Sequence, residues 1–155
     1  MAAIVLGAAP AAAQDPAAGA TIFAERCAVC HQENGQGVAG VYPPINETLG
    51  HFLATASGRR YLGEAVAFGL AGSISVGGQP YIGQMTLAPP LSDQEIADVL
   101  TYVLTAFNSG SLPAGADSFS ADEIAAARAT PKAPTDVAKG RQAVIAELKQ
   151  IGLER

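Results

Sequence analysis

The chain of 155 residues contains no tryptophan, two cysteines and two histidines, and charged residues make up only 15% of it. Two cysteines are too few for a framework of several disulfides. Between Asp15 and Asn108 there are eight acidic residues, three basic residues and no lysine. Phosphate binding needs clustered lysine and arginine, so we expect no nucleic-acid partner.

Both cysteines lie in the segment Cys27-Ala28-Val29-Cys30-His31. This spacing is typical of a c-type haem attachment site, in which two thiols form thioethers with the vinyl groups and the histidine binds the iron. The alternatives are a redox cysteine pair and half of a zinc site. A zinc site needs two further ligands, and a redox pair normally accompanies a βαβ pattern; His51 is the only other histidine. The motif therefore predicts one covalent haem c on Cys27 and Cys30, with His31 as iron ligand.

The second axial ligand is predicted to be Met85, the only methionine after the start residue. Glycines and prolines flank it, which favours a shaped loop over a position inside a helix. A thioether ligand raises the reduction potential of a haem. Three alternatives remain: a methionine that fills the core, His51 as the sixth ligand, and an open sixth position.

Apolar periodicity and turn residues predict a mostly helical chain. Ser92 with Glu95 forms a capping box, and Ser120 is a further N-cap candidate. The expected helices span 16–26, 60–69, 93–107, 121–129 and 135–153, with a helical turn or two within 47–57 and a small hairpin over 74–81 that turns at Gly77-Gly78.

Residues 1–13 are small and apolar and end in Ala11-Ala12-Ala13. They resemble the apolar region and cleavage site of a secretory signal peptide whose basic start is missing or truncated. The alternative is a disordered alanine-rich leader. The segment is too short to span a bilayer, which takes about 20 apolar residues. Because c-type haem is normally attached outside the bacterial cytoplasm, we expect a periplasmic protein that begins near Gln14 and has no transmembrane anchor.

Residues 16–108 resemble the class I cytochromes c, particularly the small periplasmic ones that serve dehydrogenases and reductases. The resemblance is carried by Gly19 and Phe23, Cys27 to His31, Tyr42-Pro43-Pro44-Ile45, the segment 74–85 and the segment 91–103. It implies an all-α cytochrome c fold wrapped around the haem. In that fold the first and last core helices cross, with Gly19 and Phe23 packed against Val99 and Tyr102.

The resemblance also implies two further contacts with the haem site. A proline carbonyl should bind the Nδ1 of His31 and fix its tautomer; Pro44 is the expected residue and Pro43 the rival. Arg60, or Arg59, should pair with a haem propionate; the alternative is that the side chain is simply exposed to solvent at the start of a helix. Thr86 departs from the family, which usually has proline directly after the ligand methionine, so this loop is expected to be less rigid.

These observations divide the chain into a signal peptide (1–13), a cytochrome c domain (14–108) and a helical extension (109–155). The extension is expected to contact a partner or another subunit; the alternatives are that it folds back over the core or is only loosely attached. The expected function is one-electron transfer, as a carrier or as the cytochrome subunit of a periplasmic oxidoreductase, without chemistry on a substrate. A redox partner should present a basic or apolar patch. The alternatives are a peroxidase-like enzyme or gas sensor with a labile sixth ligand, and a structural haem subunit.

Overall fold

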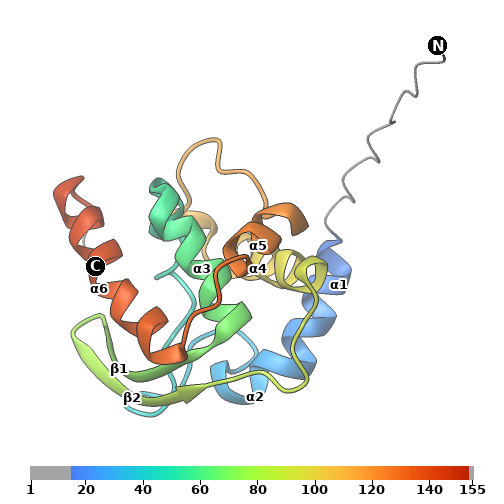
Figure 1. Cartoon of the computed structure of the whole chain (residues 1–155), viewed down its shortest axis with the longest axis horizontal. Coiled ribbons are helices and arrows are strands. Elements are labelled where there is room, and N and C mark those ends of the chain that lie inside the picture. The colour runs from blue at the N-terminus through green and yellow to red at the C-terminus, as the bar shows by residue number, and fades with distance from the viewer. Residues whose placement is uncertain (1–14, 154–155) are drawn as a thin grey trace.

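The computed structural model describes residues 15–153, so the predicted signal peptide lies outside the described part. Helices and one β-hairpin surround a single core (Figure 1). In chain order the elements are α1 (Pro16–Ile22), η1 (Phe23–Cys27), α2 (Ala28–His31), η2 (Gly50–Ala54), α3 (Ala56–Phe68), β1 (Leu70–Val76), β2 (Gln79–Met85), α4 (Asp93–Phe107), η3 (Ser109–Ser111), α5 (Ala121–Arg128) and α6 (Pro134–Gln150).

The first and last helices of the core, α1 and α4, cross as predicted. Asp15 caps α1, because its side chain accepts hydrogen bonds from the next backbone N–H groups. At the crossing a Cβ on Gly19 would lie 2.3 Å from the carbonyl oxygen of Asp98, so only glycine allows this approach. One turn further along the chain, at the start of η1, the ring centroid of Phe23 lies 5.7 Å from that of Tyr102.

The predicted regular helix over 16–26 is wrong in its last turn. Residues Phe23–Cys27 form a π-helical turn, in which the Ala28 N–H donates to the carbonyl of Phe23. A π-turn takes up one extra residue and so rotates everything that follows it. Apolar periodicity in the sequence does not reveal a π-turn. Here the π-turn sets the direction in which Cys27 leaves the helix.

Helix α3 begins at Ala56, four residues before the predicted start. Thr55 caps it by accepting a hydrogen bond from the Gly58 N–H. Gly69 follows its end with a φ of 80°, as predicted for a C-cap glycine.

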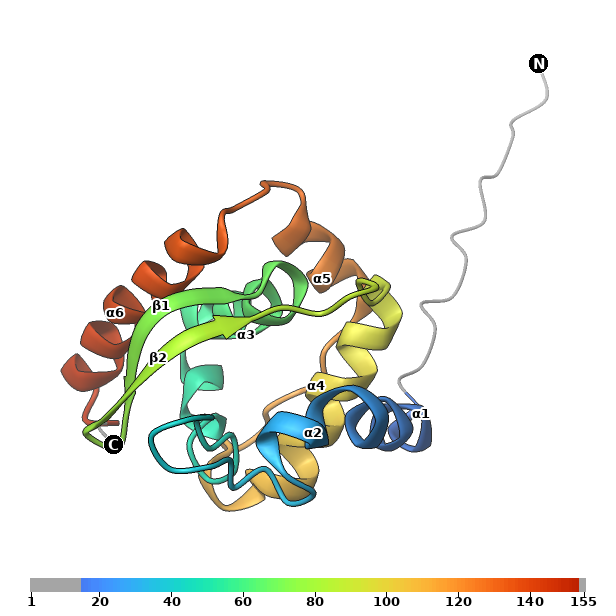
Figure 2. The same cartoon turned by 90° about the horizontal axis from the view of Figure 1, so that it is seen from below.

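The hairpin is longer than predicted. Strands β1 and β2 pair antiparallel from Val76 opposite Gln79 to Leu70 opposite Met85, around the predicted Gly77-Gly78 turn. Met85 is therefore the last residue of a strand rather than part of a loop. Helix α6 runs along β1, and the concave side of the hairpin faces α2 (Figure 2).

Both predicted N-caps of the later helices are confirmed. Ser92 and Glu95 form a complete capping box at α4, and Ser120 and Glu123 form another at α5. In each box the serine hydroxyl accepts from the third N–H while the glutamate binds the backbone N–H of the serine, which satisfies two otherwise unpaired donors.

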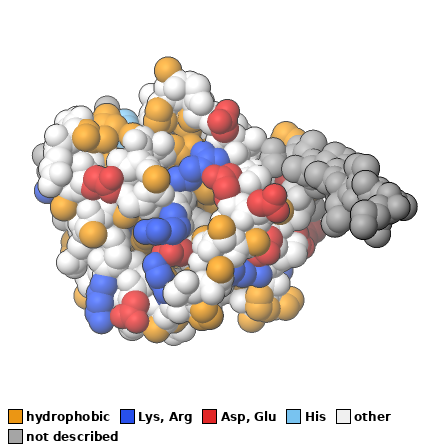
Figure 3. Space-filling model, turned by 45° about the horizontal axis from the view of Figure 1, so that its top comes forward, with side chains coloured by type: hydrophobic (Ala, Val, Ile, Leu, Met, Phe, Trp, Pro, Cys, Tyr) orange, Lys and Arg blue, Asp and Glu red, His pale blue; other side chains and the backbone are white. Residues whose placement is uncertain are grey.

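The extension folds back over the core. Helix α5 packs on α3 and α4, and α6 packs on α3 and β1. Ion pairs accompany this packing, and basic and acidic side chains lie next to each other on the face in Figure 3. The pairs that join extension and core are Arg59–Glu123, Lys132–Glu64 and Arg128–Asp93. No helix within residues 15–153 is long and apolar enough to cross a membrane.

Gly19→Ala should lower the free energy of unfolding by about 1–3 kcal/mol, because the overlap with the Asp98 carbonyl outweighs the better helix propensity of alanine. The matched control is Gly140→Ala in α6, where nothing lies within 4 Å of the added Cβ. It should raise stability by about 0.5–1 kcal/mol. Chemical denaturation of both variants tests this, and equal effects would contradict the close crossing.

Candidate haem-binding site

The two cysteines occupy consecutive turns that leave the helix crossing. Cys27 ends the π-turn, Cys30 lies in α2, and both are half-buried free thiols. Burial raises the pKa of Cys27 to about 11, so the thiol stays protonated in apolar surroundings. A thioether carries no charge and suits that environment.

His31 is oriented by the loop that follows it. Its Nδ1 lies 2.9 Å from the carbonyl oxygen of Pro43. Because a carbonyl only accepts, Nδ1 carries the proton and Nε2 keeps a free lone pair for a metal. Burial lowers the pKa of the imidazole below its ordinary value, which favours the neutral form that ligation requires.

The expected partner of His31, Pro44, is wrong by one residue. Tyr42 exchanges backbone hydrogen bonds with Val38 and so closes the turn just before the prolines. The next carbonyl, that of Pro43, is then the one that meets the imidazole. The carbonyl of Pro44 instead accepts from the Thr48 hydroxyl. Two adjacent prolines look alike in the sequence, and only the register of this turn distinguishes them.

Met85 is half-buried at the end of β2. Its backbone is held against the end of α3, where a Cβ on Gly69 would lie 2.2 Å from the Met85 carbonyl oxygen. Gly69 also has a φ of 80°, which L side chains rarely adopt. Glycine is therefore required at position 69 both by the close approach of Met85 and by the positive φ. This contact fixes the backbone of Met85 against the end of α3.

The two arginines considered for a propionate contact are engaged elsewhere. Arg59 binds Glu123 with an Nε–Oε1 distance of 2.5 Å, lies over the Phe119 ring, and lowers the pKa of the Glu123 carboxyl. The Arg60 side chain is 64% exposed and lies 3.6 Å from Glu64. The predicted propionate contact of Arg60 thus has no support from its surroundings.

Arg141 is a candidate that sequence reasoning missed. It belongs to α6, is only 7% exposed, and has no carboxylate partner among the described residues. Its guanidinium lies 5.0 Å from the centre of the Phe52 ring and 6.0 Å from that of Tyr61. One Nη donates to the carbonyl of Ser75 on β1 at 3.4 Å. Burial raises the pKa of Tyr61, and the nearby guanidinium opposes this rise.

A buried cation without a counter-ion costs several kcal/mol, so the position of Arg141 calls for an anion beside it. The sequence held a signal for this. Val137, Val144 and Leu148 are buried on α6 at helical spacing, and Arg141 falls on the same stripe. An arginine on the apolar stripe of a helix must find a partner inside the protein.

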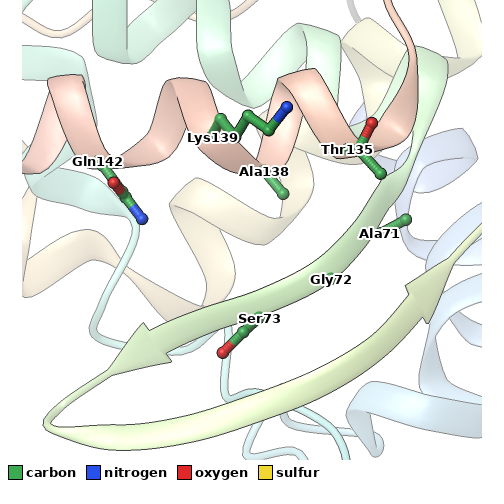
Figure 4. Close-up of a pocket in the computed structure, with 7 residues that line it drawn as sticks. All are labelled: Ala71, Gly72, Ser73, Thr135, Ala138, Lys139 and Gln142. Atoms are coloured by element: carbon green, nitrogen blue, oxygen red, sulfur yellow. The ribbon is translucent and has the colours of Figure 1, made fainter.

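Other sites receive no support. His51, the rival sixth ligand, is half-buried in the short turn η2. No group of three or more His, Cys, Asp or Glu side chains that could hold a metal ion occurs in residues 15–153. A hollow of about 210 Å³ lies between β1 and α6, lined by small residues and by Lys139 and Gln142 (Figure 4). The Lys139 amine there already pairs with Asp136 on its own helix.

Comparison with known proteins agrees with this geometry. The family model for cytochrome c matches residues 16–107. The chain is 40% identical to cytochrome c-552 of Thermus thermophilus over 136 residues, which cover 88% of this chain and 98% of the relative. The chain is therefore a class I c-type cytochrome and belongs to the cytochrome c family.

Two further relatives match a shorter part of the chain. Cytochrome c6 of Picosynechococcus sp. is 36% identical over 95 residues, which cover 61% of this chain and 75% of the relative. A cytochrome c subunit of a quinone alcohol dehydrogenase from Gluconobacter oxydans is 30% identical over 86 residues, which cover 56% of this chain and 17% of that subunit. Covalent haem c with its iron is the cofactor of this family.

The residues of this site fit that group. Two adjacent turns present the thiols, a neutral imidazole keeps Nε2 free, and a buried guanidinium lacks an anion. Cys27 and Cys30 would attach the haem, His31 would bind the iron, and Arg141 could take a propionate.

Proposed function

We propose that the protein is a periplasmic one-electron carrier, free or as the cytochrome subunit of an oxidoreductase, with His31 and Met85 as axial ligands and the helices wrapped around the haem. Haem c supplies the ferric–ferrous couple when bound. The observation that carries the proposal is the neutral His31, fixed through Nδ1 with Nε2 free. The mature N-terminus in a periplasmic extract should lie near Gln14; a retained leader would oppose export.

In this proposal the protein sets the potential and excludes water, and it moves no proton to a substrate. The Pro43 carbonyl orients the imidazole and increases its basicity. The Met85 thioether favours the ferrous state. Holding both ligands in place keeps reorganisation small when the electron arrives.

Met85→Ala should remove the weak far-red sulfur-to-iron absorption band from the oxidised spectrum. The same change should open the sixth position, so the ferrous variant should bind carbon monoxide readily. Spectra of both redox states of the wild type and the variant measure this. A wild type without the band, high-spin and reactive with carbon monoxide, would instead favour a gas sensor or a peroxidase-like enzyme.

We further propose that Arg141 and Tyr61 bind a haem propionate. The guanidinium is buried against Phe52 and Tyr61, and propionate would supply the missing anion. Arginine is suited to this role because its fork matches a carboxylate in two hydrogen bonds.

Arg141→Gln should lower the reduction potential by an amount on the order of tens of millivolts, because a positive charge near the haem favours the ferrous form. Lys139→Gln removes the same charge from the same helix, but that side chain is 76% exposed. Potentiometric titration of both holoproteins provides the comparison. Equal shifts in the two variants would exclude a specific propionate contact.

The surface near the haem attachment segment supports an apolar docking mode. Val29 lies within the haem motif and is 75% exposed, and Val41 and Tyr42 are exposed in the loop that orients His31. The domain around them carries more acidic than basic residues. We propose that the redox partner contributes an apolar patch with basic groups around it.

Val29→Ser should slow bimolecular electron transfer to a basic cytochrome c several-fold, because apolar contact area is lost at the docking surface. Ile151→Ser, also an exposed apolar residue but on the extension, is the control and should leave the rate unchanged. Stopped-flow rates over a range of salt concentrations measure both effects. A rate that rises with salt would show that this protein's docking surface repels a basic partner, against the acidic surface that we propose.

A further inference from the structure

Residues 86–91 connect the predicted ligand Met85 to helix α4, and we call them the 86–91 loop. The loop has no regular secondary structure. Within the described part of the chain, no backbone–backbone hydrogen bond involves it. Pro89 and Pro90 are exposed, Leu91 is buried in the core, and Leu87 packs half-buried against it. Something other than its own backbone must hold this loop in place.

Two arginines bind the loop, one from the segment before the haem motif and one from the extension. Arg26 directly precedes Cys27 and donates from Nη2 to the carbonyl of Pro89 at 2.6 Å. It therefore joins the haem attachment segment to the segment that follows Met85. The two bonded residues are 63 positions apart in the sequence, so this bond connects segments that the chain itself does not hold together.

The second arginine comes from the extension. Arg128, the last residue of α5, donates from Nη2 to the carbonyl of Leu91 at 2.5 Å. Its Nη1 lies 3.1 Å from Asp93, at the start of α4. The guanidinium thus ties the end of the loop to the first turn of the next helix. The bonds from Arg26 to the Pro89 carbonyl and from Arg128 to the Leu91 carbonyl have charged donors and are stronger than bonds between neutral groups.

We propose that Arg26 and Arg128 are positioning residues for Met85, and that they limit how often the thioether leaves the iron. This inference rests on the proposed ligation by Met85. Thr86 stands directly after Met85, so the chain lacks the fixed φ that a proline would impose there. The two guanidinium groups supply a restraint in its place, because they hold the carbonyls of Pro89 and Leu91 in the second half of the loop.

The restraint acts on kinetics. For Met85 to leave the iron, the residues after it must move, because Gly69 and the pairing with Leu70 hold the residues before it. Each bond from an arginine has to break or stretch in that motion. Losing one partly exposed charged hydrogen bond should therefore speed Met85 dissociation about 3- to 10-fold. If the two act independently, losing both should multiply the factors.

The test uses ferric holoprotein and cyanide as the entering ligand, because cyanide binds only after Met85 has left. The variants are Arg26→Gln, Arg128→Gln and the double variant. Lys139→Gln is the matched control, with the same charge change at an exposed residue that pairs only within α6. The saturating rate of cyanide binding is measured, together with the far-red band and global stability in denaturant.

The expected result is faster cyanide binding in both arginine variants, with the far-red band retained at rest and the control unchanged. Arg26→Lys, which keeps the charge but loses the planar fork, should recover part of the effect. Wild-type rates in both arginine variants would overturn the inference, and so would increases that merely follow the loss of global stability. A wild type without the far-red band would instead overturn Met85 ligation itself, so the two failures are distinguishable.

Discussion

The crossing of α1 and α4 at Gly19 is the contact on which the haem site depends. Helix α1 leads through the π-turn into the haem motif, and α4 begins directly after the 86–91 loop. At the crossing, the backbone of Gly19 packs directly against Asp98 and the Cβ of Tyr102. The segments that carry the two predicted iron ligands are therefore both connected to this close helix contact. The distance between the predicted ligands therefore depends on two short connections. One is the π-turn between α1 and the haem motif, and the other is the 86–91 loop, which the arginine hydrogen bonds hold.

Arginines do much of that fixing. Four of them, Arg26, Arg59, Arg128 and Arg141, donate to backbone carbonyls in segments far away in the sequence. A guanidinium has five donors in a rigid fork, so one side chain can bind a carbonyl and a carboxylate together. This use explains how loops with little regular structure keep a defined shape.

The sequence revealed features that depend on neighbouring residues. The Ser92 capping box, the N-cap at Ser120, the glycine at the end of α3, the Gly-Gly turn and the crossing at Gly19 were predicted because each follows from a local pattern or from the family resemblance. It did not reveal features that depend on register between distant segments. The choice of Pro43 over Pro44 depends on the pairing of Val38 with Tyr42, and the π-turn leaves no mark on apolar spacing. The role of Arg141 depends on which face of α6 meets the core.

The packing of the extension also constrains where a partner can dock. The apolar side chains of α5 and α6 that point inward, such as Ile124 and Val137, are already buried against the core. On the described part of the extension, the one large exposed apolar residue is Ile151 near its end. The exposed apolar residues gather instead in the haem motif, in the loop after it and on β2, where Ile82 is 78% exposed. Electron transfer rates fall steeply with distance, so a partner that meets the motif side gains both contact area and proximity to the haem. The described part of the extension contacts the hairpin through α6 and the 86–91 loop through Arg128, and Ile151 is its one large apolar side chain left exposed.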